Sequence, residues 1–504
     1  MKKGQVCKGV VESLSFPNKG KVRVIEVEGS IEDEGIGSIA TVKNCIPGQI
    51  IEFRITKKKS DRIQGNLLSI IERADNENVD DVCRHFGECG GCTYQTIDYD
   101  AQLEIKSKQI RDIFIPVIGE QEFDDVFEGI KRSPKQFGYR NKMEFSFGDE
   151  LKDGPLTLGM HKRGSFYDVV TVDDCRIVDE DYRLILVSTL EFFSGLGATY
   201  YHKMRHEGYL RHLLVRKSAK KGEILVCLVT SSDWDCGNDG NFADESVMLE
   251  AWSDMLQELT LTGELVGVLH TTNDGVADIV KDEGTDILFG RDYITEEILG
   301  LTFKITPFSF FQTNSLGAEI LYDTAREFIG DGIGSDTCLY DLYSGTGTIA
   351  QMMAPAVNKV IGVEIVEEAV NAAKENTSIN GLSNCEFIAG DVLKVLDDIE
   401  DKPDYIILDP PRDGINPKAL NKIIDYGVDS IIYISCKPTS LARDLEMLKG
   451  TYEVKRMACV DMFPGTGHVE VICSMSKQKK PDAHIKIELT AEEYMKFVKD
   501  DYIE

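Results

Sequence analysis

The alternation of strand-like and helix-like segments after about residue 305 constrains the fold more than any other feature of this sequence. Short runs rich in Val, Ile and Tyr are separated there by longer amphipathic segments. The strands that we expect are TCLYDLY, KVIGVEI, CEFIAG, YIILDP, SIIYIS and HVEVICSM. This alternation predicts an α/β doubly wound, Rossmann-like domain built on a parallel sheet. Ligands of such sheets bind at the carboxyl ends of the strands, so residues that follow each strand are the candidate site residues.

A glycine-rich turn follows the first of these strands. DLYSGTGTIA places Gly345 and Gly347 between a strand and a helix, where glycine lets the backbone approach a ligand. Glu364 ends the next strand, from where an acidic side chain can reach the hydroxyls of a ribose. NAD is one candidate, but the turn lacks the third glycine of G-x-G-x-x-G. Asp391 follows the third strand, where methyltransferases commonly bind the adenine amino group, and this favours S-adenosylmethionine.

The last strands of the region carry a candidate nucleophile and base. YIILDPPRDGI places Asp409 at a strand end, in a DPPR segment similar to the fourth motif of nucleic-acid methyltransferases, and SIIYISCKP ends in Cys436. A thiolate there can add to C6 of a uracil, so that C5 becomes nucleophilic enough to accept a methyl group. Glu470, in PGTGHVEV, is the candidate base for the C5 proton. A structural buried thiol and a surface glutamate are the alternatives.

We expect the thiol of Cys436 to need an electropositive setting. A free cysteine has a pKa of about 8.5, and a positive neighbour lowers it. Lys437 is adjacent in the sequence and is the expected source of that charge.

Three cysteines are crowded into CRHFGECGGC. Cys83, Cys89 and Cys92 have the spacing C-x5-C-x2-C, and soft thiolates select an iron-sulfur cluster or zinc. The spacing does not choose between the two. The chain has 13 cysteines in all, an odd number spread along its length, which argues against a framework of disulfides.

The chain divides into four expected parts. The pattern of residues 1–72 predicts the short strands of a small β-barrel. Within it, KNCIPGQIIEFRITKKKSD resembles part of a TRAM domain, a relative of the oligonucleotide-binding fold that is found in RNA-modifying enzymes. Residues 73–304 form a mixed α+β central domain with the cysteine cluster. Residues 305–476 form the Rossmann-like methyltransferase domain, and residues 477–504 a tail.

The charge of the chain argues both for and against a nucleic-acid partner. A formal net charge of −30 is unfavourable for binding phosphates. The cations nevertheless cluster at 57–59, 131–142 and 203–221, which predicts a basic face. We find no signal-peptide pattern and no apolar run long enough for a membrane span, so the expected location is cytoplasmic.

Taken in order, the motifs CGGC, FFQTN, DLYSGTGTIA, GVE, DPPR, SCKP and HVE resemble those of the S-adenosylmethionine-dependent RNA uracil-C5 methyltransferases. The resemblance covers nearly the whole chain. One departure is PGTGHVE, where members of the family often have His-Thr in place of Gly-Thr. The resemblance implies roles for the following residues: Gln312, Tyr343, Glu364 and Asp409 contact S-adenosylmethionine, Cys436 is the nucleophile, Glu470 is the base, and Phe310 lies against the RNA or the flipped base.

The resemblance also bears on the metal and the substrate. It implies that Cys175, in VDDCRIVDE, is a fourth ligand and that the centre is a [4Fe-4S] cluster, with zinc as the alternative. The barrel and the cysteine cluster together are similar to the branch that modifies 23S ribosomal RNA, and the T-loop of tRNA is the second candidate. For Phe310, a core aromatic remains the alternative.

Two alternative functions use some of the same motifs. RNA cytosine-C5 methyltransferases usually carry a second cysteine directly after the prolines of the DPP-like segment, but Arg412 stands there. The other alternative is a non-catalytic RNA-binding iron-sulfur protein.

Overall fold

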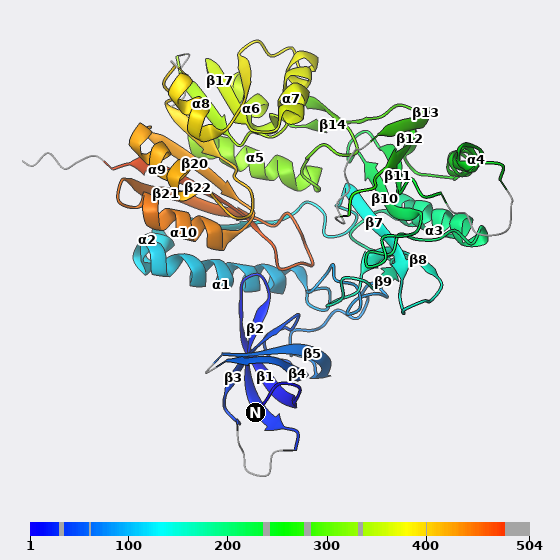
Figure 1. Ribbon diagram of the computed structural model, residues 1–504. Coiled ribbons are helices and arrows are strands. Elements are labelled where there is room, and N and C mark those ends of the chain that lie inside the picture. Colours follow the sequence, from blue (N-terminus) through cyan, green and yellow to red (C-terminus); the bar gives the residue numbers. More distant parts are fainter. Residues whose placement is uncertain are drawn as a thin grey trace, which may run out of the picture.

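The computed structural model describes residues 1–29, 35–59, 62–234, 242–276, 284–330, 336–399 and 401–478 (Figure 1). Its strands form a closed barrel, a seven-stranded sheet, a two-stranded sheet and an eight-stranded sheet. The expected tail lies outside the described residues from 479 onward. Among the described residues, no helix is both long and apolar enough to span a membrane.

The N-terminal strands close into a barrel in the order β1-β2-β3-β5-β4. They are β1 (Val6–Ser15), β2 (Lys19–Val27), β3 (Ile39–Lys43), β4 (Ile50–Lys59) and β5 (Arg62–Glu72). Alternate residues point inward, as the two-residue period of a strand requires, and Val22, Val24, Ile51 and Phe53 are among those fully buried inside.

The central sheet has the order β13-β12-β11-β10-β7-β8-β9. Its elements are β7 (Lys142–Asp149), β8 (Leu156–His161), β9 (Val169–Thr171), α3 (Glu180–Gly195), β10 (Leu210–Lys217), β11 (Glu223–Thr230), α4 (Glu245–Gln257), β12 (Glu264–Thr272) and β13 (Thr285–Gly290). A hairpin of β14 (Ile294–Ile298) and β15 (Leu301–Ile305) follows. Trp252 of α4 is fully buried in the core beneath this sheet.

The C-terminal sheet is doubly wound, with the order β18-β17-β16-β19-β20-β22-β21-β6. Its first five strands are parallel, and the order reverses between β16 and β19, where such sheets bind ligands. The elements are α5 (Ser315–Ile329), β16 (Cys338–Leu342), α6 (Thr348–Met353), the 3-10 turn Ala354–Ala356, β17 (Lys359–Glu364), α7 (Glu367–Ile379), β18 (Cys385–Ala389), α8 (Val392–Asp398), β19 (Tyr405–Leu408), α9 (Pro417–Tyr426), β20 (Ser430–Ser435), α10 (Pro438–Leu448), β21 (Tyr452–Val460) and β22 (Glu470–Lys477). Separate apolar cores cover its two faces.

The segment α1 (Tyr99–Ile118), α2 (Glu120–Val126) and β6 (Phe127–Lys131) packs on the C-terminal sheet, although the sequence places it in the central part. β6 pairs in parallel with β21, and Ile110 and Phe114 of α1 are buried in the core on that face. Figure 1 shows α1 running between the barrel and the C-terminal sheet. This helix therefore connects the barrel to the edge of the sheet where β22 begins.

Candidate active site

Cys436 and Glu470 face each other at the ends of two adjacent strands. β20 ends at Ser435 and β22 begins at Glu470, and the antiparallel register pairs Ser435 with Val471. Continued by one residue, that register sets Cys436 opposite Glu470. The predicted nucleophile and base are thus brought together by strand pairing.

The surroundings of Cys436 raise the pKa of its thiol to about 11. Burial is the main cause, and the negative charges of Glu470 and Asp409 add to it, while Arg412 lowers the pKa. The expected electropositive setting is therefore wrong, because burial and the two carboxylates outweigh the effect of Arg412. Lys437 instead lies with its Nζ 3.6 Å from a carboxylate oxygen of Asp413.

Three carboxyl groups at this edge of the sheet have raised pKa values. Burial raises the pKa of Asp341 to about 8, that of Asp409 to about 7 and that of Glu470 to about 8, and the charge of Asp409 adds to the first and third shifts. Asp341 and Glu470 are 0% and 4% exposed, whereas Asp409 is partly exposed. Acidic groups held near neutrality in this way favour a positively charged ligand.

The two predicted glycines have different surroundings. Gly345 has a φ of +53°, and a Cβ built on it would meet nothing within 4 Å, so its backbone faces open space. Gly347 has a φ of +73°, and its Cβ would lie 2.6 Å from the ring of Phe387. Gly345 thus leaves open space beside the strand end, whereas close packing accounts for the glycine at position 347.

Glu364 lies directly beside the open glycine. Its carboxylate accepts a hydrogen bond from the Gly345 backbone N–H at 3.1 Å and others from Ile365 and Val366. The same turn contains two buried polar atoms without a hydrogen-bond partner in the described chain, Asp341 Oδ1 and Ser344 Oγ. Unsatisfied buried polar atoms beside open backbone are what a polar ligand would satisfy.

The other predicted cofactor residues lie around the same edge. Tyr343 adopts a φ of +69°, and burial together with the charge of Asp391 raises its pKa to about 12. Asp391 also caps α8 by accepting from the Leu393 N–H. Gln312 is partly buried and hydrogen-bonds the hydroxyl of Tyr322.

Phe310 is exposed beside the glycine turn. Its side chain is 71% exposed, and its backbone carbonyl accepts from the Thr346 hydroxyl at 3.5 Å. A core aromatic, the alternative considered from the sequence, is therefore wrong.

The four predicted metal ligands lie near one another in two segments. Burial raises the pKa of Cys92 to about 11 and that of Cys175 to about 12, and the charges of the neighbouring cysteines add to both shifts. All four thiols are free of disulfides. Within the described ranges, however, no three His, Cys, Asp or Glu side chains are arranged to hold a metal ion. The positions of these side chains therefore do not by themselves establish a metal centre.

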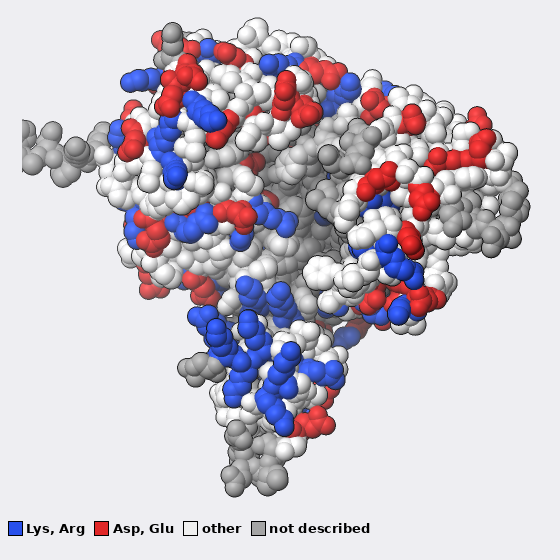
Figure 2. Space-filling view, viewed as in Figure 1, with Lys and Arg blue, Asp and Glu red and all other residues white. Residues whose placement is uncertain are grey.

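Cations gather on the barrel rather than on the other two predicted segments. Figure 2 shows Lys and Arg side chains clustered there, next to a hollow between the barrel and the two large sheets. We call this cluster the basic barrel face, and it consists of the exposed residues Lys19, Lys21, Lys43, Arg54, Lys57, Lys58, Lys59 and Arg62. By contrast, Arg211 and Arg216 are buried, and Arg132 is paired with Asp100. Of the three cationic runs predicted from the sequence, only 57–59 belongs to this basic barrel face.

Comparison with known proteins agrees with this geometry. A family model described as tRNA (uracil-5-)-methyltransferase matches residues 250–478. An RNA methyltransferase of Clostridium tetani is 44% identical over 479 residues, covering 95% of this chain and 99% of that protein. The chain belongs to the S-adenosylmethionine-dependent RNA uracil-C5 methyltransferase family. An RNA methyltransferase of Caldanaerobacter subterraneus is 45% identical over 95% of this chain and 100% of its own length.

A solved structure shares the fold over most of the chain. The crystal structure of the Pyrococcus abyssi tRNA (uracil-54, C5)-methyltransferase with S-adenosyl-L-homocysteine aligns with a TM-score of 0.67 and 24% identity. The alignment covers 93% of this chain and 100% of that one. The two chains therefore share a fold over most of their length.

Two residues of this methyltransferase site were missed from the sequence. Tyr322 is 4% exposed, and its pKa is raised well above the usual range by burial and by the carboxylates Asp409, Asp341 and Glu470. Arg412 is exposed and lowers the pKa of both Cys436 and Glu470. Arg412 stands within the DPPR motif and could have been singled out there, whereas Tyr322 lies in an ordinary amphipathic helix without any motif.

Proposed function

We propose that this chain transfers a methyl group from S-adenosylmethionine to C5 of a specific uridine in 23S ribosomal RNA, through a covalent bond between Cys436 and C6. The observation that carries the proposal is the facing pair of Cys436 and Glu470 at the sheet edge that also holds the open glycine turn. The enzyme would act in the cytoplasm.

The reaction divides between the two residues. The thiolate of Cys436 adds to C6, and C5 gains the electron density that it lacks in free uracil. Once C5 is methylated, Glu470 removes the C5 proton, the C5–C6 double bond forms again, and the thiolate of Cys436 leaves. A carboxyl group with a pKa of about 8 is a far stronger base than an ordinary glutamate, which suits the removal of a carbon-bound proton.

S-adenosylmethionine supplies the electrophilic methyl group as a sulfonium, and the residues at the sheet edge fit such a ligand. Glu364 would accept hydrogen bonds from the ribose hydroxyls, and Asp391 would accept one from the adenine amino group. Gln312, Tyr343 and Asp409 would contact the rest of the molecule. The raised pKa values of Asp341 and Asp409 favour a cation at this place.

RNA binding is assigned to two surfaces. The exposed ring of Phe310 offers a stacking partner for the target base or its neighbour, since unstacked bases bind aromatic side chains. The basic barrel face supplies contacts to phosphates despite the net charge of −30. The Pyrococcus enzyme named above acts on tRNA, so the T-loop is the competing substrate.

We assign Cys83, Cys89, Cys92 and Cys175 to a [4Fe-4S] cluster with a structural or RNA-positioning role. Support comes from their proximity, from the electrostatic effect of each thiol on the others and from the glycines between them. Binding would require the thiols to ionise and to rotate toward one centre. Iron and sulfide analysis of protein purified without oxygen tests the assignment. A stoichiometric amount of zinc in place of iron and sulfide would show that the site is a zinc site instead.

The function is tested with purified protein, S-adenosylmethionine and RNA labelled with tritium at C5 of uridine. We expect tritium release to water that matches methyl transfer in ribosomal RNA, with no transfer by Cys436→Ala. Methyl transfer to tRNA but not to ribosomal RNA would show that the substrate is the T-loop of tRNA. Methylation of cytosine, or no methylation of any RNA, would support one of the alternatives weighed from the sequence.

A further inference from the structure

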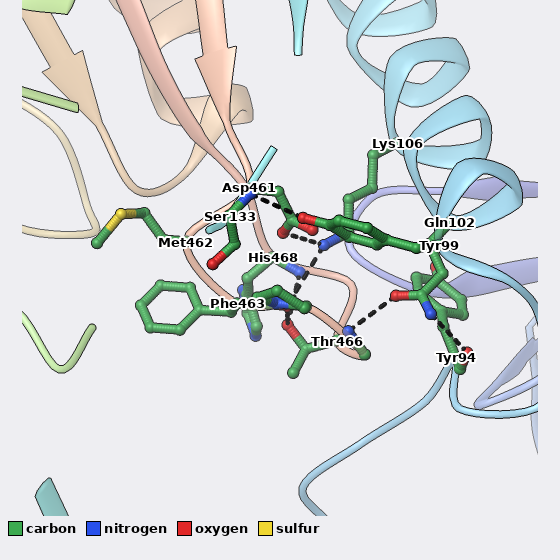
Figure 3. A network of polar contacts seen from close by, with 12 residues as sticks. Tyr94, Tyr99, Gln102, Lys106, Ser133, Asp461, Met462, Phe463, Thr466 and His468 are labelled. Carbon is green, nitrogen blue, oxygen red and sulfur yellow. Dashed lines mark hydrogen bonds and ion pairs between the residues drawn. The ribbon is translucent and has the colours of Figure 1, made fainter. Parts of the chain in front are cut away.

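The segment 461–469, which joins β21 to β22, leads directly to Glu470. We call it the base loop. It contains no regular secondary structure, so its shape depends on contacts with other parts of the chain. Figure 3 shows how side chains of α1 reach into it.

The strongest of these contacts is a fully buried ion pair. Lys106 Nζ lies 2.6 Å from Asp461 Oδ1, and both side chains are 0% exposed (Figure 3). Lys106 Nζ also lies 3.4 Å from the carbonyl oxygen of Phe463, to which it donates. A single ammonium group of α1 therefore holds the base loop at two points.

The remaining carbonyls of the base loop are held from several elements. Met462 O accepts from Asn314 Nδ2 at 2.9 Å, and Pro464 O accepts from the Tyr139 hydroxyl at 3.0 Å. Gly465 O accepts from the backbone N–H groups of Thr93 and Tyr94, in the segment that follows Cys92. Four consecutive carbonyls, from 462 to 465, are thus bound by four separate parts of the chain.

The barrel also touches the base loop. The ring of Phe16, in the turn between β1 and β2, meets that of His468 edge-on, with centroids 6.4 Å apart. A Cβ on Gly467 would lie 2.4 Å from the carbonyl oxygen of Pro17, so the two backbones are in direct contact. His468 is only two residues before Glu470, so the barrel reaches close to the base.

Stability alone does not account for the Lys106–Asp461 pair. Removing two charges from water is costly, and apolar residues of similar volume often stabilise a protein as well or better. A buried pair can, however, hold the segment that carries it in one arrangement, because a shifted segment would leave both charges buried and unpaired. The base must be within hydrogen-bond reach of the C5 proton, so the arrangement of this segment bears directly on catalysis.

We propose that the Lys106–Asp461 ion pair positions Glu470, through the base loop, for removal of the proton from C5. The proposal rests on the function proposed above. Lys106 and Asp461 are positioning residues, since neither is exposed to substrate. Their loss is expected to slow the step in which Glu470 acts, after methyl transfer, and to leave earlier steps largely intact.

The test uses the full-length Lys106→Met variant with RNA and methyl-labelled S-adenosylmethionine. A displacement of about 1 Å can reduce a rate about 100-fold, so we expect kcat to fall by about that factor while KM for RNA changes less than about twofold. The covalent protein–RNA adduct, already methylated, should accumulate and be visible on a denaturing gel. Product release at the wild-type rate, or an equal loss of adduct formation and release, would overturn the proposal.

Lys217→Met is the matched control. Lys217 is largely buried in the central domain, where its Nζ pairs with Asp181 at 2.6 Å and with Asp179 at 2.5 Å, and none of its described side-chain hydrogen bonds or ion pairs reaches the base loop. This variant should have a lower Tm and release product normally. If it accumulates adduct as well, the effect of Lys106→Met is one of general destabilisation and the proposal fails.

Two more variants complete the test. If Lys106→Met does not fold, the double variant Lys106→Met, Asp461→Leu removes the unpaired buried charge, and it should fold and still accumulate adduct. Release by this double variant at the wild-type rate overturns the proposal. Glu470→Gln separates the two hypotheses, because an absence of adduct in that variant contradicts the proposed function itself.

Discussion

Gly347 is packed against the ring of Phe387 so closely that a Cβ on the glycine would lie 2.6 Å from Cε1 and Cζ of that ring. Gly345, two residues earlier in the same turn, faces open space. Both residues have positive φ values, but only one of them has a neighbour that forbids a side chain. The same motif thus contains one glycine required by packing and one that leaves room for a ligand.

Alanine substitutions should separate these two roles. Gly347→Ala combines an unfavourable left-handed conformation with overpacking, so we expect it to destabilise the C-terminal domain by about 2 to 4 kcal/mol. Gly345→Ala should cost only about 1 kcal/mol, from the backbone alone, but should weaken binding of S-adenosylhomocysteine. Calorimetric unfolding and ligand titration of both variants measure these effects. An equal loss of stability in the two variants would contradict the separate roles given to these glycines.

Much of this edge could be predicted because local sequence determines where a strand ends. Asp409 and Cys436 each follow an apolar run, and parallel strands bring such ends to one edge. The last expected strand, HVEVICSM, is indeed β22, but it runs antiparallel to β20. That reversal is what sets Glu470 opposite Cys436, and it depends on β21, which the sequence analysis did not identify.

Long-range packing could not be predicted from periodicity. Lys106 stands in an amphipathic helix and looks like a solvated cation, yet it is fully buried against Asp461, 355 positions away. Arg216 belongs to the basic run 203–221 but is buried on β10 of the central sheet, where it donates to the carbonyl oxygen of Pro307. In both cases the partner that makes burial tolerable is remote in sequence.

Arg412 should control the reactivity of the nucleophile. Its positive charge lowers the pKa of Cys436, which burial, Glu470 and Asp409 raise to about 11. Arg412→Met should therefore raise that pKa further, so that alkylation by iodoacetamide becomes slower at each pH between 7 and 10. Lys437→Met is the control, because its ammonium group lies with Asp413, and it should leave the alkylation profile in place. A larger effect from Lys437 than from Arg412 would contradict this account.

The stability of the ligand-free protein should depend on Glu470 in a characteristic direction. Its carboxyl has a pKa of about 8 when folded, against about 4.3 for an unperturbed glutamate, so the folded state binds the proton more tightly. The contribution of this group to the free energy of unfolding is thus fully present below about pH 4 and is lost as pH rises to about 8. Glu470→Gln cannot ionise, and its Tm should fall less than that of the wild type between pH 5 and 8. Parallel curves for the two proteins would show that the carboxyl is not perturbed.

The basic barrel face should account for much of the salt dependence of RNA binding. Lys21 and Lys57 are exposed on β2 and β4, and neither forms an ion pair with another residue that the structure describes. Each phosphate contact contributes about 0.7 to 0.9 to the slope of log affinity against log salt, so Lys21→Glu with Lys57→Glu should reduce that slope by about 1 to 2.

Lys374→Glu, on α7 of the C-terminal domain, makes the same change of charge away from the barrel and should leave the slope unchanged. Because Lys21 and Lys57 are exposed and belong neither to the catalytic pair nor to the contacts with the base loop, kcat at saturating RNA should be retained in the double variant. A lower kcat with an unchanged salt slope would instead mean that these lysines act on the catalytic edge through the contact between Phe16 and His468.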